Sequence, residues 1–104
     1  MDSIIWEKGA EEKFKKLVEK IPPFMRGIAG EKVSKRAQAL VSEAGRMEIT
    51  EKDLVDAFFK ETPGGFHGVM KADMEEIGVD YTQYGYEKDE WKNIFGSKKD
   101  EPKR

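Results

Sequence analysis

The stretch Gly45-Arg46-Met47-Glu48-Ile49-Thr50-Glu51-Lys52-Asp53 decides the fold of this chain. Glycine accepts the left-handed conformation in which many helices end, so Gly45 is predicted to terminate a preceding helix. The next residues, 47–49, are predicted to be extended. Thr50 is a preferred N-cap residue, and Asp53 stands where a capping box has its partner. The stretch therefore predicts a helix, a short extended Ile-Thr link and another helix.

The helix before this stretch is predicted to start at residue 23 or 24 and to end at residue 43 or 44. Proline is tolerated at its start because the N–H there has no intrahelical partner. Gly27 and Gly30 each weaken a helix by up to about 1 kcal/mol relative to Ala, and we expect a close helix–helix approach at residues 25–30. The predicted buried face consists of Phe24, Ile28, Val33, Ala37, Leu40, Val41 and Ala44.

A first helix is predicted at about residues 7–20. Its apolar residues share one stripe of a helix with 3.6 residues per turn; they are Ala10, Phe14, Leu17, Val18 and Ile21. Trp6 extends this stripe at the helix entrance. Pro22 and Pro23 end the helix because proline donates no backbone hydrogen bond and restricts the residue before it.

Beyond the link, a helix is predicted at about residues 51–62 and a shorter one at about 66–77. The first of these presents Leu54, Val55, Phe58 and Phe59 to a core, and the second presents Val69, Met70, Met74 and Ile77. We therefore expect a small all-α domain of three to four helices over residues 1–96, with a histone-like helix–strand–helix arrangement. Residues 61–96 form an acidic, aromatic extension, and residues 97–104 a disordered tail.

Composition excludes several kinds of chemistry. The 104 residues include no cysteine, which excludes disulfides, thiolate zinc sites, iron–sulfur clusters and a cysteine nucleophile. No apolar run approaches the roughly 18 to 20 residues of a membrane span, and the N-terminus lacks the pattern of a signal peptide. We expect a cytoplasmic protein with no membrane partner, no catalytic residues, no metal and no cofactor.

Charge is distributed unevenly along the chain. Residues 1–46 carry ten Lys or Arg against seven Asp or Glu, whereas residues 47–97 carry five against twelve. An acidic second half argues against nucleic acid, since such binding depends largely on neutralising phosphates.

A family resemblance covers about residues 6–60. It rests on Trp6, Ala10, Phe14, Lys20-Ile21-Pro22-x-Phe24-x-Arg26, Ala37, Gly45, Ile49-Thr50, Asp53 and Ala57. In this order they resemble the PCP_red domain, the small C-terminal domain of the B subunit of light-independent protochlorophyllide reductase. The resemblance implies an association with an oxidoreductase of chlorophyll biosynthesis in photosynthesis. Because the catalytic subunits need cysteine ligands, it implies an accessory module that docks on a larger cytosolic redox or tetrapyrrole-related protein.

The candidate partner- or ligand-binding surface is the corner between the first two helices. It consists of Ile21, Pro22, Phe24, Met25 and Arg26. The guanidinium of Arg26 suits a tetrapyrrole propionate or a carboxylate of a partner. The alternative is a local ion pair with Glu31 or Glu43, or a charge on the helix surface.

His67, the one histidine, is a further candidate. It lies in Gly64-Gly65-Phe66-His67-Gly68. A histidine there can ligate the metal of a haem or chlorin or act as a general base. The alternative is a solvated loop or capping residue.

Three functions remain open at the level of sequence. The first is a non-catalytic interaction module. The second is a histone-like DNA-binding dimer; its phosphate contacts would be Lys8, Lys13, Lys16, Lys32, Lys35 and Arg36. The third is an oxidoreductase subunit that contributes to a tetrapyrrole site. A homodimer is compatible with the first two.

Overall fold

The computed structural model describes residues 3–88. Contacts divide the chain into two compact units, Met1–Pro63 and Gly64–Arg104. In chain order the elements are β1 (Ile5–Trp6), α1 (Lys8–Lys20), α2 (Pro23–Glu43), β2 (Glu48–Ile49), α3 (Glu51–Glu61), the 3₁₀ helix η1 (Gly64–Phe66), α4 (His67–Glu76) and the 3₁₀ helix η2 (Tyr81–Tyr84). The predicted all-α class, with a short extended link before the third helix, is confirmed. The predicted tail, 97–104, lies outside the described residues.

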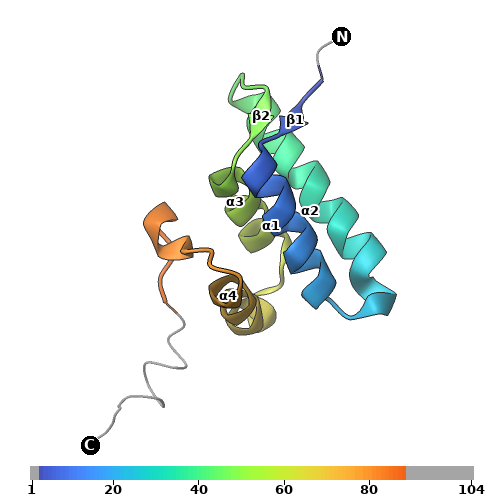
Figure 1. The fold of residues 1–104 in the computed structure, drawn as a ribbon, viewed down its shortest axis with the longest axis vertical. Coiled ribbons are helices and arrows are strands. Elements are labelled where there is room, and N and C mark those ends of the chain that lie inside the picture. The colour runs from blue at the N-terminus through green and yellow to red at the C-terminus, as the bar shows by residue number, and fades with distance from the viewer. Residues whose placement is uncertain (1–2, 89–104) are drawn as a thin grey trace, which may run out of the picture. The chain divides into compact units, whose positions relative to one another are not determined.

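Helices α1 and α2 form a hairpin with a two-residue turn, and α3 lies behind them in the view of Figure 1. The side chain of Glu7 caps α1 by accepting a hydrogen bond from the Ala10 N–H at 2.9 Å. Ile21 and Pro22 have extended backbones, which ends α1, and Pro23 is the first residue of α2. Since the turn is so short, α1 and α2 run antiparallel.

Strand β1 pairs in parallel with β2, with Ile5 opposite Glu48 and Trp6 opposite Ile49. This pairing lies at the end of the hairpin away from the α1–α2 turn (Figure 1). The sequence predicted only that Trp6 would extend the stripe of the first helix. A strand of two residues is too short to show the alternation that predicts a strand.

An ion pair holds the link between α2 and α3. Asp53 is 4% exposed, and its Oδ2 accepts hydrogen bonds from the Thr50 N–H (2.8 Å) and hydroxyl (2.9 Å). The guanidinium of Arg46 donates to both carboxylate oxygens, at 3.0 and 2.5 Å, and to the Glu48 carbonyl at 3.2 Å. Burial raises the pKa of Asp53, but the hydrogen bonds from Arg46 and Thr50 outweigh it, so the net shift is downward. The carboxylate therefore stays charged and fixes the start of α3.

The core of the first unit is built from α1, α2, β2 and α3. Its buried side chains are Ala10, Leu17, Val33, Ala37, Val41, Ile49, Leu54, Val55, Ala57 and Phe58. Lys13 of α1 pairs with Glu51 at the start of α3, and Arg36 of α2 pairs with Glu61 at its end, with Nε 2.7 Å from Oε2. Among the described residues of the second unit, Met70, Met74, Val79 and Tyr81 are buried, whereas Val69, which was predicted to face the core, is 63% exposed. The Tyr81 hydroxyl donates to Glu75 Oε2 at 2.5 Å.

The buried face predicted for α2 is wrong in the N-terminal half of this helix and at Ala44, which follows the helix and is exposed. Phe24 and Ile28 are 84% and 67% exposed, whereas Val33, Ala37 and Val41 are buried. The step from Ile28 to Val33 is five residues, which rotates the side chain by about 140° around a helix with 3.6 residues per turn. The two sets of apolar residues therefore lie on different faces.

No helix within residues 3–88 is both long enough and apolar enough to cross a membrane.

Candidate functional site

The predicted corner residues lie together in and after the turn that joins α1 to α2. Ile21 is partly buried and Pro22 is exposed. Phe24 is 84% exposed and Met25 is 44% exposed. Exposed large apolar side chains in a cluster are uncommon on a surface without a binding role. The corner is therefore apolar and open to a partner.

Arg26 has a structural task within this corner. Its Nε donates to the carbonyls of Val18 and Ile21, both at 3.1 Å, and its Nη2 donates to the carbonyl of Glu19 at 2.8 Å. These carbonyls belong to the last turn of α1 and to its C-cap residue Ile21, where backbone carbonyls need partners from outside the helix. Arg26 thus caps α1 and fixes the hairpin, and its guanidinium faces backbone carbonyls rather than either suggested glutamate.

His67 is the first residue of α4 and is partly exposed. It belongs to the second unit, whereas the corner belongs to the first. The two candidates therefore belong to different units of the chain, and the groove between α1 and α2 belongs to the first.

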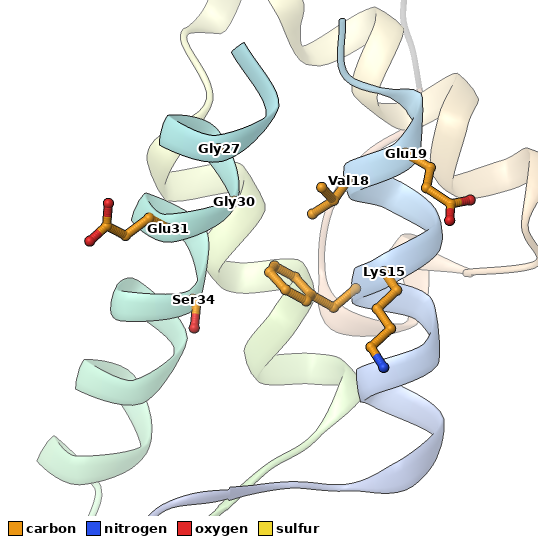
Figure 2. A pocket seen from close by; sticks show the side chains of 8 residues that line it. Lys15, Val18, Glu19, Gly27, Gly30, Glu31 and Ser34 are labelled. Carbon is orange, nitrogen blue, oxygen red and sulfur yellow. The ribbon is translucent and has the colours of Figure 1, made fainter. Parts of the chain in front are cut away.

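A groove of about 500 Å³ runs between α1 and α2. Its lining residues are Phe14, Lys15, Val18, Glu19, Gly27, Gly30, Glu31 and Ser34. Val18 points from α1 toward α2, whereas Glu19 and Glu31 point outward on opposite sides (Figure 2). The groove therefore has an apolar floor and charged rims.

An aromatic stack fixes one wall of the groove at the end nearer to β1. The rings of Trp6 and Phe14 lie 4.8 Å apart between centroids, at an interplanar angle of 30°. Stacking of this kind adds roughly 0.5–1.5 kcal/mol to area burial. Since Phe14 also lines the groove, the stack holds one wall of the groove in place.

An apolar ridge adjoins the groove on α2; we define it as Phe24 and Ile28. These residues are four apart and so lie on one face of the helix. Gly27 and Glu31, which line the groove, lie on the same stretch of helix surface because positions i, i+3, i+4 and i+7 are neighbours. Groove and ridge together make up what we call the α1–α2 face.

The two glycines of α2 are not required by packing inside the first unit. A Cβ on Gly27 would meet no atom within 4 Å, and one on Gly30 would lie in ordinary contact, 3.6 Å from Val18 Cγ2. The predicted close helix–helix approach therefore does not explain Gly27. Glycine within a helix costs roughly 0.5–1 kcal/mol relative to Ala. The fold tolerates this cost without any internal benefit at Gly27.

Sequence reasoning missed Ile28, Phe14 and Val18 as surface residues, because all three were assigned to the core. The five-residue step after Ile28 was the available signal for that residue. Phe14 and Val18 share the stripe of the buried Leu17, so periodicity alone cannot separate a groove wall from the core.

No group of three or more His, Cys, Asp or Glu side chains within the described residues is arranged to hold a metal ion. The pKa of Asp80 is lowered because the Thr82 hydroxyl and N–H donate to its carboxylate. This is the N-cap of η2, so its altered pKa reflects a local turn.

A family model described as "Protein of unknown function (DUF2621)" matches residues 2–87. The chain belongs to this family. The match extends over both units rather than over residues 6–60 alone. Comparison with curated proteins gave no match, and neither did comparison with solved structures.

The family match overturns the predicted membership of the PCP_red family. Residues that carried the resemblance serve the local structure: Arg26 caps α1, Asp53 caps α3, and Ala37, Ile49 and Ala57 are buried. Capping and core residues of this kind are common in helical proteins, so the pattern does not identify a family. The implied links to chlorophyll biosynthesis, photosynthesis and oxidoreductase chemistry are withdrawn with it.

Proposed function

We propose that this chain is a non-catalytic interaction module whose α1–α2 face binds a helical element of another protein molecule. The observation that carries the proposal is Phe24, a large apolar side chain that is 84% exposed on a well-formed helix. Exposed aromatic residues beside a groove are typical anchors of protein interfaces. The expectation that the partner is a larger protein remains a prediction.

A helix is the partner element that best suits this surface. The groove lies between two antiparallel helices and has an apolar floor with charged rims. An amphipathic helix laid into such a groove buries apolar residues at positions i, i+3 or i+4, and i+7. Its polar residues would then meet Lys15 and Glu19 on the α1 rim and Glu31 on the α2 rim.

Nothing in the structure favours the DNA-binding alternative. Of its six proposed cations, Lys13 pairs with Glu51, Lys35 with Glu31 and Arg36 with Glu61. An acidic neighbour offsets the attraction of a cation for phosphate, so these side chains would release less counterion on binding. A steeply salt-dependent gel shift would reverse this assessment.

Photo-crosslinking tests the proposed function directly. A photoreactive phenylalanine analogue replaces Phe24, Ile28 or, as a control, Met47, in the full chain within its host cells. Met47 is also an exposed apolar residue, at 44%, but it lies beside β2 and outside the α1–α2 face.

We expect positions 24 and 28 to crosslink to the same peptide, with position 47 giving none of that product. Mass spectrometry should place the crosslinks on a segment whose apolar residues recur at helical spacing. Equal labelling from all three positions, or no product from 24 and 28, would refute an interaction role for this face.

A further inference from the structure

We infer that the helical element bound by the α1–α2 face is α2 of a second copy of this chain, so that two α1–α2 hairpins pair around a two-fold axis. The inference rests on the proposed function and names its partner. Three observations carry it: the ridge and groove occur on the same face, Gly27 has no internal role, and the rims carry no net charge.

The face is complementary to itself in shape. A two-fold interface brings the same patch together from both copies, so a patch that holds both a ridge and a groove can satisfy both. The ridge residues, Phe24 and Ile28, are four apart, and so are two groove residues, Phe14 and Val18. A side-chain pair on one helix can thus pack over an equally spaced pair on the other.

The direction of the helices permits this match. A two-fold axis perpendicular to α2 makes the two copies of α2 antiparallel. Because α1 and α2 are antiparallel within each copy, α2 then runs parallel to α1 of the second copy. Phe24 and Ile28 can therefore lie in order over Phe14 and Val18 of the second copy, and the four helices form a bundle.

Gly27 supplies the close approach that such a crossing requires. Gly27 lines the groove and lies between the two ridge residues in sequence. A Cβ at this position would meet no atom within 4 Å. The distance between packed helix axes depends on the side chains at the crossing point. A glycine at the crossing lets the α2 backbone approach α1 of the second copy closely, which accounts for a residue that the monomer does not need.

Charge also favours a second copy. The rims carry Lys15 and Glu19 on α1 and Glu31 on α2. Lys35 does not line the groove, but its Nζ lies 3.2 Å from Glu31 Oε2 and offsets that charge. Two positive and two negative side chains leave the face neutral, so two identical faces do not repel each other. A strongly basic or acidic partner finds no matching field here.

The size of the face predicts a weak dimer. The 13 residues of α1 make a helix about 20 Å long, and two helices side by side are about 20 Å wide. The projected area of about 400 Å² is below the roughly 800 Å² per partner of a standard stable interface. We therefore expect a dissociation constant on the order of tens of micromolar.

Sedimentation velocity of the full chain, from about 1 to about 500 µM, tests the inference. The wild type should shift from monomer to dimer over this range. Phe24→Ser and Ile28→Ser should each weaken the dimer about tenfold or more, and Gly27→Ala should do so while the fold becomes more stable. Met47→Ser is the control: Met47 is 44% exposed but lies outside the α1–α2 face, so this change should leave the dimer unchanged. Circular dichroism checks that each variant is folded.

Each result has a definite reading. A wild type that stays monomeric to about 500 µM overturns the dimer, and so does a dimer unaffected by the Phe24, Ile28 and Gly27 variants. If positions 24 and 28 nevertheless crosslink to a helix of a different protein, the proposed function stands and only the second copy is wrong. If the dimer fails and those crosslinks are also absent, both proposals fail.

Discussion

The two halves of α2 differ in what their residues do for the first unit. The C-terminal half buries Val33, Ala37 and Val41 in the core. It leads into the ion pair of Arg46 with Asp53, which we call the clip. From Phe24 to Gly30 the large apolar side chains are exposed, and the glycines fill no internal need. One helix thus combines a half that builds the fold with a half that the fold does not explain. The N-terminal half of α2 is where binding residues are expected.

The largest expected contrast is in the free energy of unfolding. Val41→Ala, in the C-terminal half at a side chain with 0% exposure, should lower it by about 2–3 kcal/mol through lost burial and a cavity. Ile28→Ala, at a side chain that is 67% exposed, should change it by less than about 0.5 kcal/mol. Urea unfolding below about 1 µM protein measures both in the monomer. A loss for Ile28→Ala comparable to that for Val41→Ala would remove the contrast between the halves.

The clip after the C-terminal half gives the next effect. Asp53→Ala should lower the free energy of unfolding by about 1–2 kcal/mol, because it removes the cap on α3 and leaves Arg46 without its partner. Arg46 is substantially exposed, so solvent screening keeps the effect well below that of a fully buried pair.

Acid should weaken the same clip in the wild type. The pKa of Asp53 is lower in the fold than its ordinary value, so its contribution is full above an unfolded pKa of about 4. This contribution is lost as pH falls from there through the folded pKa. Urea midpoints between pH 3 and pH 6 should therefore show a difference between wild type and Asp53→Ala that shrinks toward low pH. A difference that is constant with pH would show that the carboxylate's charge does not contribute.

Replacing the glycines near the two ends of α2, Gly27 and Gly45, by alanine should change the free energy of unfolding with opposite signs. Gly45→Ala should lower the free energy of unfolding by about 1–2 kcal/mol, because φ is +72° there and a side chain disfavours the left-handed region. Gly27→Ala should raise it by about 0.5–1 kcal/mol, because alanine is the better helix former and its methyl group meets no atom within 4 Å. Both are measured by urea unfolding of dilute protein. A destabilising Gly27→Ala would mean that the fold itself needs this glycine.

Sequence reasoning recovered the elements that depend on local chemistry. Gly45, Thr50 and Asp53 predicted the end of α2, the link and the start of α3, since turn and cap residues act on neighbours in the chain. The Pro22-Pro23 turn predicted the hairpin for the same reason. Strand β1 was missed because it is defined only by its partner, and Phe24 and Ile28 were misassigned because an apolar residue looks alike in a core and at an interface. Arg26 was found as part of the corner, but its capping contacts depend on how two helices meet.

Hydroxyl-radical footprinting of Met25 and Met47 tests the central claim, that the N-terminal half of α2 is a binding surface. Both methionines are 44% exposed in the isolated chain, so they should oxidise at similar rates in dilute purified protein. In host cells we expect oxidation of Met25 to fall severalfold while that of Met47 stays the same, with labelling of Phe24 falling alongside Met25. Equal oxidation of Met25 and Met47 in both settings would contradict the account.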